Sequence, residues 1–417
     1  MFKTFETHES QVRSYCRNFP VVFKHAKNAE LFSSEGERFI DFFSGAGAMN
    51  FGHNNPYIKG KILEYLSEDN IIHALDMYTV AKDRFIKTLF EKVLDPKRLD
   101  YKVMFCGATG TNAVEAALKI SRKNKQRTNV FAFSGAFHGM TLGSLSLTTD
   151  KFSREGANIP LTNVTFMPFC NQFKDPSMSL EYLEWALEDD HSGIDKPAAI
   201  FLETVQAEGG IVVADIEWLQ RISEICKKYD IMMVCDDIQV GICRTGPYFS
   251  FERAGIAPDI VILSKSLSGF GLPMSVLLIN PKNDILAPAE HNGTFRGNQL
   301  GFIGAAAAID YYAENNLPEI VRKNGEFIRE FIEKEILPID ERLFYRGIGM
   351  IWGIDFSGIE NIMSKIVMNK CFDNSLVIER AGHFDSVLKI MPPLTVEQSI
   401  LEEGLAIVKK SIISVIR

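Results

Sequence analysis

Lys265 is the residue whose position in this chain best suits covalent chemistry. It follows the apolar run in Pro258-Asp-Ile-Val-Ile-Leu-Ser-Lys-Ser-Leu-Ser-Gly-Phe-Gly, and glycines come after it. The apolar residues predict a strand, so the amine stands at a strand end, where it can bond the aldehyde of a cofactor. Read alone, the same position also suits an ordinary surface lysine.

Asp236 and Asp237 end a second apolar run, in Val234-Cys-Asp-Asp-Ile-Gln-Val-Gly. In an α/β protein, polar groups at the carboxyl end of a strand lie where ligands bind. Neighbouring side chains on a strand point to opposite faces, so only one of the two acids needs to enter a site. Lys265 lies 29 residues after Asp236 (265 minus 236), enough for a helix and another parallel strand. Without Lys265, the simpler interpretation is that both acids cap a helix.

Two further segments add a phosphate-binding turn and an aromatic ring. Met104-Phe-Cys-Gly-Ala-Thr-Gly-Thr-Asn-Ala predicts a strand, a turn and a helix start, where backbone N–H groups and the hydroxyls of Thr109 and Thr111 can hold a phosphate. A plain helix N-cap explains this segment equally well. In Gly135-Ala-Phe-His-Gly-Met-Thr, Phe137 can stack on a flat cofactor, although a core phenylalanine is commoner. Together the cradle, the ring, the acid and the lysine match the needs of pyridoxal 5'-phosphate.

The elements that must position these residues follow an alternating pattern between residues 100 and 280. Short apolar runs alternate with segments of helical periodicity, which indicates an α/β fold with a mainly parallel sheet covered by helices. The predicted strands are Lys102–Phe105, Val130–Phe133, Ala199–Leu202, Met232–Cys235, Ile260–Leu263 and Ser275–Ile279. The predicted helices are Thr111–Lys123, Ile216–Tyr229 and Gln299–Glu314.

The two ends of the chain predict a smaller second unit. A hairpin is expected around residues 33–38, near the N-terminus. A charged helix from Pro318 to about Ile336 precedes strand candidates near Met350–Asp355, Val377 and Leu388–Ile390. We therefore expect an N-terminal segment of a small domain over residues 1–45, a large cofactor-binding domain over 46–316 and a C-terminal small α+β domain over 317–417.

Composition and charge restrict the class of partner. The chain has 417 residues, 46% of them hydrophobic, which is enough for a large core and a smaller second one. A formal charge of −8 and a pI near 5.6 argue against nucleic acid as a partner. The seven cysteines are scattered and no histidine has ligand-like spacing, so we expect reduced thiols and no metal site. Because no signal-like N-terminus and no long apolar run occur, we expect a cytoplasmic protein without a membrane span.

Six motifs resemble, in order and spacing, those of class III aminotransferases. They are Gly107-Ala-Thr-Gly-Thr-Asn-Ala-Val-Glu-Ala-Ala-Leu-Lys, Phe137-His-Gly-Met-Thr, Glu203-Thr-Val-Gln-Ala-Glu-Gly-Gly, Asp236-Asp-Ile-Gln, Asp259-Ile-Val-Ile-Leu-Ser-Lys and Gly293-Thr-Phe-Arg-Gly-Asn. The resemblance covers nearly the whole chain. It implies a fold-type I transferase with a mainly parallel seven-stranded sheet, helices on both faces and a smaller α+β domain. It also implies a homodimer or larger homo-oligomer with active sites shared between subunits.

The same resemblance implies roles for the matched residues. Lys265 would bond pyridoxal 5'-phosphate, Asp236 would pair with the ring nitrogen, and Gln239 would hydrogen-bond to the ring hydroxyl. Further cofactor contacts would come from Ala108, Thr109, Gly110, Phe137, His138, Glu203 and, from the neighbouring subunit, Thr294. An amino donor and a keto acid acceptor would react in turn, by ping-pong kinetics, with the Lys265 amine moving the proton.

Within the family, four segments are similar to the branch that moves the terminal 4-amino group of L-2,4-diaminobutyrate to 2-oxoglutarate in ectoine- and siderophore-type biosynthesis. They are Gly45-Ala-Gly-Ala-Met-Asn-Phe-Gly-His-Asn-Asn-Pro, Gly107-Ala-Thr-Gly-Thr-Asn-Ala-Val-Glu, Gly293-Thr-Phe-Arg-Gly-Asn and Leu388-Lys-Ile-Met-Pro-Pro-Leu-Thr. Another ω-aminotransferase, acting on ornithine, acetylornithine, 4-aminobutyrate or a diamine, stays open. A non-catalytic binding module is a remote alternative, because the lysine and the acid are both present.

Two departures from ornithine- and aminobutyrate-type relatives concern the substrate carboxylate. Met140 stands where many of them carry arginine, and Lys389 stands where they usually carry a second arginine, three residues before Pro392-Pro. Our hypothesis is that Lys389 contacts Glu208 in one half-reaction and a substrate carboxylate in the other, with Arg296 as a helper. The alternative is a solvated lysine at a strand end. The small side chain of Ala46 suggests further room for substrate.

Overall fold

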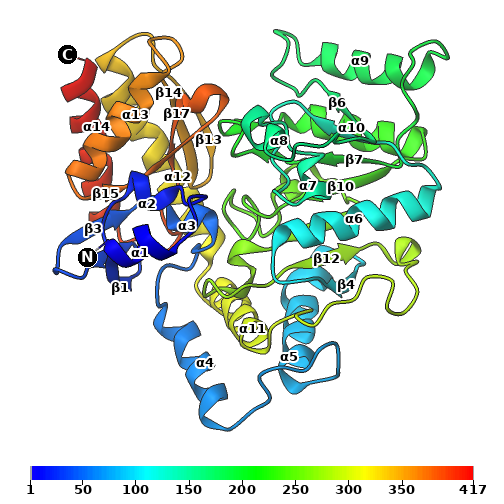
Figure 1. Ribbon diagram of the computed structural model, residues 1–417, viewed down its shortest axis with the longest axis horizontal. Helices are drawn as coiled ribbons and strands as arrows, with labels where there is room; N and C mark the ends of the chain where they lie inside the picture. The colour runs from blue at the N-terminus through cyan, green and yellow to red at the C-terminus, as the bar shows by residue number, and fades with distance from the viewer. Residues whose placement is uncertain (1, 417) are drawn as a thin grey trace.

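The computed structural model describes residues 2–416, and its main feature is a seven-stranded sheet (Figure 1). The strand order is β4-β12-β11-β10-β7-β5-β6, and β12 is the one strand in it that runs antiparallel to its neighbours. The strands are β4 (Lys102–Phe105), β5 (Val130–Phe133), β6 (Val164–Met167), β7 (Ala199–Leu202), β10 (Met232–Asp236), β11 (Ile260–Leu263) and β12 (Val276–Ile279). The predicted mainly parallel seven-stranded sheet is therefore confirmed.

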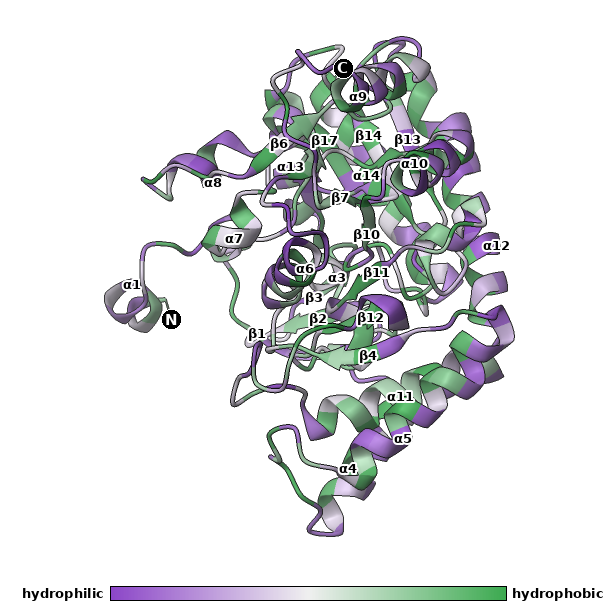
Figure 2. Cartoon of the chain, turned by 90° about the vertical axis from the view of Figure 1, so that its right-hand side faces the viewer, coloured by the Kyte–Doolittle hydropathy of each residue, from purple (hydrophilic) through white to green (hydrophobic). Residues whose placement is uncertain are grey.

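Helices cover both faces of this sheet, because its strands are apolar on both sides. In β11, Ile260 and Ile262 pack in one core with α6, while Val261 and Leu263 pack in another core with α10. The helices of this part are α5 (Val80–Leu89), α6 (Gly110–Lys125), α7 (Leu142–Leu145), α8 (Lys151–Glu155), α9 (Ser177–Glu188), α10 (Ile216–Lys228) and α11 (Gln299–Glu314). Figure 2 shows α11 as mostly hydrophobic, in keeping with its Ala-rich sequence and buried position.

Two smaller sheets build the second part of the molecule. One has the order β1-β2-β3-β15 and the other β13-β14-β17-β16. Their strands are β1 (Phe23–Lys27), β2 (Glu30–Ser33), β3 (Arg38–Asp41), β13 (Phe344–Ile348), β14 (Ile351–Asp355), β15 (Leu376–Val377), β16 (Glu379–Ala381) and β17 (Val387–Ile390). The long helices here are α12 (Leu317–Phe331), α13 (Ile362–Asp373) and α14 (Gln398–Ile416), and a separate short hairpin joins β8 (Val205–Gln206) to β9 (Val212–Val213).

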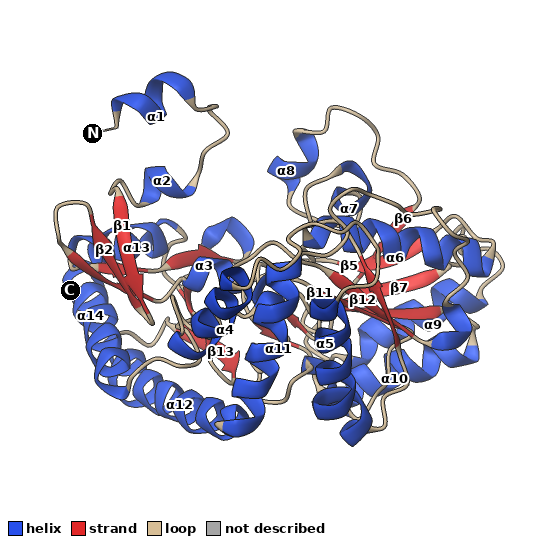
Figure 3. Cartoon of the chain, turned by 90° about the horizontal axis from the view of Figure 1, so that it is seen from below, coloured by secondary structure: helices blue, strands red, loops and turns tan. Residues whose placement is uncertain are grey.

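The N-terminal strands share a sheet with the C-terminal part, since β3 pairs in parallel with β15. The hairpin predicted around residues 33–38 is present between β2 and β3. Four further α-helices lie before the large sheet: α1 (Lys3–His8), α2 (Tyr15–Asn18), α3 (Ser44–Gly47) and α4 (Pro56–Ser67). Figure 3 shows α1 and α2 at the edge of the molecule, and neither contains a buried residue. The domain boundaries at residues 45 and 316 stay predictions.

Short helical turns complete the described elements. Two are π-helical, η1 (Phe90–Leu94) and η6 (Ile332–Ile336), and the latter ends the helix that was expected to run to about Ile336. The 3₁₀ turns are η2 (Asp95–Lys97), η3 (Ser250–Ala254), η4 (Lys265–Ser268), η5 (Pro281–Asn283), η7 (Leu337–Ile339) and η8 (His383–Asp385). Within residues 2–416, no helix is long and apolar enough to cross a membrane.

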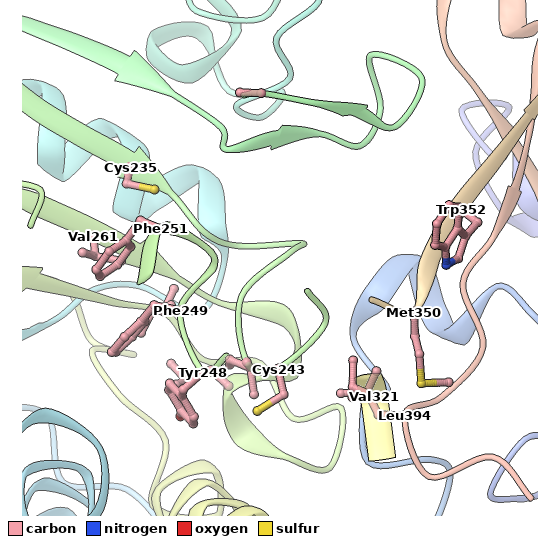
Figure 4. Packing of buried hydrophobic residues seen from close by; sticks show 14 of the residues in the cluster. Cys235, Cys243, Tyr248, Phe249, Phe251, Val261, Val321, Met350, Trp352 and Leu394 are labelled. Carbon is pink, nitrogen blue, oxygen red and sulfur yellow. The ribbon is translucent and has the colours of Figure 1, made fainter. Parts of the chain in front are cut away.

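One apolar core connects the large sheet to the second part of the molecule (Figure 4). Tyr248, Phe249 and Phe251 form successive ring contacts beside the sheet. Met350 and Leu394 belong to the same core on the side of the smaller sheets. The large sheet and the two smaller sheets are therefore held together by one continuous apolar core.

Candidate active site

The predicted chemical residues meet in one cavity of about 160 Å³. The side chains at its wall are supplied by loops that follow β5, β7, β10 and β11 and by the start of α6. The predicted residues in the lining are Gly110, Phe137, His138, Glu203, Glu208, Asp236, Gln239 and Lys265. In mainly parallel sheets, the carboxyl ends of the strands are where ligands bind, so this location fits a catalytic site.

Lys265 opens the turn η4 directly after β11, with φ at +49°. Among the described residues, its amine has neither a hydrogen bond nor an ion pair. Burial lowers the pKa of the Lys265 amine, Lys389 lowers it further, and Glu208 opposes them. The amine therefore loses its proton more easily than a lysine in water, which suits a nucleophile or a base.

The Lys265 turn rests on α11 through two glycines. Gly269 ends the turn with φ at +68°, and a Cβ added to it would lie 2.4 Å from the Cβ of Ala308. A Cβ added to Gly304 in α11 would lie 2.3 Å from the carbonyl oxygen of Ser268. Both distances are below normal contact, so these glycines allow the turn to approach the helix closely.

Asp236 ends β10 and is paired with His138. The Asp236 Oδ2 atom lies 2.7 Å from Nδ1 of His138, and its Oδ1 accepts a hydrogen bond from the Ile238 backbone. Both residues are almost fully buried, and the Nε2 atom of His138 has no partner among the described residues. The sequence placed His138 near the ring-stacking residue but gave no sign of this contact, because 98 positions separate the two residues.

Asp237 points away from the cavity, as the alternation of side chains on a strand predicts. Its carboxylate accepts hydrogen bonds from the backbone and the hydroxyl of Ser250. Burial nevertheless raises the pKa of Asp237 to about 7. Asp236 is therefore the acid that enters the site.

The start of α6 reaches the cavity through Gly110 and Thr111. Thr109 is the N-cap residue but makes no side-chain cap, and both Ala108 and Thr109 are exposed. A helix of 16 residues presents free N–H groups and the positive end of its dipole at its start. This end of the cavity can therefore hold an anionic group such as a phosphate.

Glu203 and Phe137 form a further part of the wall. The backbone N–H of Phe137 donates to Glu203 Oε2 at 3.2 Å. Burial raises the pKa of Glu203 well above its usual range, and the nearby charge of Asp236 adds to the effect. The Glu203 carboxyl group at the cavity wall therefore releases its proton less easily than one in water.

Lys389 lies between two carboxylates and is fully buried. Its Nζ atom is 2.7 Å from Glu208 Oε1 and 2.8 Å from Glu379 Oε1. The alternative of a solvated strand-end lysine is therefore wrong, because the side chain points inward from β17 into this cluster. Burial would raise the pKa of Glu208, but Lys389 and Lys265 together hold it at about 2. Burial raises the pKa of Glu379 to about 7, against the opposing charge of Lys389.

Glu379 was not predicted from the sequence. It lies opposite Lys389 in the antiparallel pairing of β16 with β17. An acid two residues after the strand candidate at Val377 was the only signal, and the register of the pairing could not be read from it.

Gln239 connects the Glu208 cluster to the N-terminal part of the chain. Its Nε2 donates to Glu208 Oε1 at 3.0 Å and to the carbonyl of Ala46 at 2.9 Å. Its Oε1 is buried and has no partner among the described residues. That oxygen can accept a hydrogen bond from a ligand hydroxyl in the cavity.

Thr294 and Arg296 lie outside the cavity of a single chain. Thr294 is exposed, and its carbonyl accepts from His73 Nε2 at 2.9 Å. Arg296 donates to the Phe105 carbonyl at 3.1 Å, and its Nη1 is 3.9 Å from Asp76 Oδ2. The role of Thr294 toward the phosphate of a neighbouring subunit and the role of Arg296 toward the substrate stay predictions.

Arg244 connects three chain segments near the cavity by hydrogen bonds. It is fully buried and donates to the carbonyls of Met350 at 2.9 Å and Pro392 at 2.5 Å, and to Asn50 Oδ1 at 2.6 Å. The Asn50 backbone N–H in turn donates to the hydroxyl of Ser266, the residue after Lys265. Burial lowers the pKa of Arg244 to about 9.

Comparison with known proteins gives consistent matches along the chain. The family model for class-III aminotransferases matches residues 12–412. A relative from Halalkalibacterium halodurans, named diaminobutyrate–2-oxoglutarate transaminase, is 48% identical over 98% of this chain and 95% of its own length. A protein with the same name from Wolinella succinogenes is 48% identical over 100% of this chain and 97% of its own.

Solved structures agree in fold. The ornithine aminotransferase of Toxoplasma gondii superposes with a TM-score of 0.86 at 23% identity, covering 99% of this chain and 94% of that one. An S-selective transaminase from Bacillus megaterium gives 0.86 at 22% identity, covering 98% and 96%. The predicted fold-type I architecture and the predicted enzyme class are confirmed, and this chain belongs to the class III aminotransferases.

Proposed function

We propose that this enzyme moves the 4-amino group of L-2,4-diaminobutyrate to 2-oxoglutarate, giving aspartate 4-semialdehyde and glutamate. The observation that carries the proposal is the geometry of one cavity, whose wall holds both the Lys265 amine and the Glu208 carboxylate. The buried cation Lys389 does not line the cavity itself but lies 2.7 Å from Glu208 Oε1. The Lys265 amine suits amino transfer, and Lys389 suits recognition of a substrate carboxylate. The relatives at 48% identity support the choice of this donor and acceptor.

The residues of the cavity fit pyridoxal 5'-phosphate. When bound, this cofactor supplies an aldehyde for the amino group and a ring that accepts electrons. His138 Nε2 and Gln239 Oε1 are buried, have no hydrogen-bond partner within residues 2–416, and belong to residues that line the cavity, so they can bond to a polar group there. The start of α6 provides the anion site, where Gly110 would be joined by Ala108, Thr109 and a Thr294 from a partner subunit.

Asp236 would face the ring nitrogen and hold a proton on it. A negative charge that is fixed by two hydrogen bonds stabilises the protonated nitrogen, which favours electron withdrawal from the substrate. Phe137 would cover the ring, and Glu203 would hydrogen-bond at its edge. His138 holds Asp236 in one orientation.

Lys265 would carry out the proton transfer. Its buried surroundings favour the neutral amine, so it can take a proton from the substrate carbon and return it to the cofactor side. The positive φ of this residue and the close packing of its turn fix the starting position of the amine. Such pre-positioning lowers the barrier for transfer.

Lys389 would recognise the carboxylate of the acceptor. With the amino donor bound, it stays paired with Glu208, as in the structure. With 2-oxoglutarate bound, Glu208 releases it and the substrate carboxylate takes its place. Arg296 from a partner subunit would assist, and the small Ala46 leaves room for the substrate.

We further propose a homodimer with shared sites. Thr294 and Arg296 lie on a loop that contacts residues 71–78 through His73 and Asp76. Exposed large apolar side chains on these two segments are Ile71, Ile72, Met77, Tyr78 and Phe295. Burial of these side chains against a second copy would bring Thr294 to the neighbouring cavity.

The seven free cysteines, six of them buried, support a reducing location such as the cytoplasm.

The decisive experiment mixes the cofactor-loaded enzyme with one amino donor at a time, without keto acid. Diaminobutyrate should convert the visible cofactor band in a single turnover, faster than ornithine, 4-aminobutyrate or acetylornithine. Mass spectrometry should then detect aspartate 4-semialdehyde. Faster conversion by ornithine than by diaminobutyrate would refute the substrate proposal.

A further inference from the structure

Lys389 has two carboxylate partners among the described residues, Glu208 and Glu379, and only Glu208 lines the cavity. We propose that Glu379 is a positioning residue, which keeps Lys389 in place and compensated while Glu208 releases it for the keto acid carboxylate. This inference rests on the proposed function. It adds a residue that does not touch the substrate and acts through Lys389.

Glu379 is held by the sheet. It stands directly opposite Lys389 in the antiparallel ladder of β16 and β17, where opposing side chains share one face. The carboxylate side chain is 9% exposed. The cavity lining includes Glu208 but neither Lys389 nor Glu379. Lys389 would therefore meet a ligand only after Glu208 has moved, while Glu379 contacts Lys389 from the strand.

Glu208 is held by a turn instead. It lies between β8 and β9 and is followed by Gly209 and Gly210, the latter with φ at +107°. Its side chain is 32% exposed, in contrast to the full burial of Lys389. To leave Lys389, the Glu208 side chain must also break its hydrogen bond from Gln239, and its place at the cavity wall gives it space to rotate into.

The burial of Lys389 explains why a second carboxylate is needed. A buried ammonium that loses its single counter-ion pays the full desolvation penalty of a charge. The charge of Glu208 helps to raise the pKa of Glu379, so departure of Glu208 favours the ionised form of Glu379. Lys389 then keeps one negative partner 2.8 Å away. When the substrate carboxylate arrives, the local charge is the same as before. Glu379 therefore lowers the free-energy cost of exchanging Glu208 for the substrate carboxylate. Lys389 has two negatively charged partners both before and after this exchange.

The two half-reactions should respond differently to loss of this residue. In the amino-donor half-reaction Lys389 stays on Glu208, so Glu379 has little influence. In the keto acid half-reaction Glu208 must leave, so Glu379 matters. A residue that only stabilises the fold would affect both half-reactions together.

The test is Glu379→Gln, measured in each half-reaction by single-turnover absorbance of the bound cofactor. We expect the apparent second-order rate constant of the aminated enzyme with 2-oxoglutarate to fall by about tenfold or more, and that with diaminobutyrate by less than about threefold. Glu379→Asp keeps the charge and should retain most of the 2-oxoglutarate rate. Equal losses in both half-reactions, or no loss, would overturn the inference.

Asp310→Asn is the matched control. Asp310 lies in helix α11, its side chain is 15% exposed, and it pairs with Lys92 at 2.7 Å. It should lower both rates alike, if at all. If Glu379→Gln binds no cofactor, Glu379→Ala, which also removes the charge, is measured instead: a fall in its 2-oxoglutarate rate alone supports the inference, and equal falls refute it. Failure of the wild-type enzyme to react with diaminobutyrate would refute the proposed function instead.

Discussion

Replacing Gly304 by alanine should displace the catalytic lysine, because Gly304 lies on the face of helix α11 that contacts the Lys265 turn. The added Cβ would lie 2.3 Å from the carbonyl oxygen of Ser268, which ends the Lys265 turn. Because a buried backbone oxygen cannot rotate away, helix α11 and the turn must separate by about 0.7 Å to reach the 3.0 Å limit of such contacts.

The expected size of the effect follows from two opposing terms. Alanine in a helix is favoured over glycine by about 1 kcal/mol. Overpacking of a core costs about 1–3 kcal/mol, and the backbone contact puts Gly304→Ala toward the upper end. We expect the free energy of unfolding to fall by about 1–2 kcal/mol. A displacement near 1 Å of a catalytic group can lower the rate by about 100-fold, so turnover should fall by 10- to 100-fold.

The assay combines urea unfolding of the cofactor-loaded enzyme with single-turnover rates. Gly60→Ala is the control, because Gly60 lies in helix α4 and an added Cβ there meets nothing within 4 Å. This control should be neutral or stabilised by up to about 1 kcal/mol. If Gly304→Ala behaves like Gly60→Ala and keeps wild-type turnover, α11 does not fix the position of Lys265.

Three other substitutions test the site. Asp236→Asn should lower the single-turnover rate by about 100-fold or more while the cofactor still binds, and a smaller loss would count against its pairing with the ring. Lys389→Ala should raise the Michaelis constant for 2-oxoglutarate, and an unchanged constant would disprove carboxylate recognition there. The pKa of Asp237 is about 7 in the folded state and about 4 in the unfolded state. Its contribution to the free energy of unfolding is therefore fully present below about pH 4 and is lost as the pH rises through 7. Asp237→Asn should therefore flatten the fall in unfolding free energy across that range, measured by urea titration.

Local patterns in the sequence were sufficient for much of the large sheet. The predicted helix Gln299–Glu314 matches α11 at both ends, and Ile260–Leu263 matches β11. Strand β6 was not predicted, because Val164-Thr-Phe-Met at the sheet edge is only partly buried and includes a polar residue. The other edge strand, β4, is also only partly buried but was predicted, because Val103-Met-Phe is an unbroken apolar run, whereas Thr165 interrupts the run in β6.

The residues that meet in the cavity were predicted from motifs, but their contacts were not. Lys265 and Asp236 were placed by strand ends, which parallel topology brings to one edge. The pairing of His138 with Asp236 links two loops distant in sequence. The pairing of Glu379 with Lys389 depends on the register of two short strands, and a shift of one residue would turn Glu379 away.

The hydrogen bonds of Arg244 have a consequence for engineering the enzyme toward other acceptors. Its guanidinium joins the carbonyl of Pro392, just beyond the strand of Lys389, to Asn50 and thereby to the Lys265 turn. A redesign that shifts the backbone near Pro392 therefore also moves the support of the catalytic amine. Variants with a new acceptor range will keep their rate only where that carbonyl stays in place, so library designs should vary side chains around Lys389 and leave loop lengths unchanged.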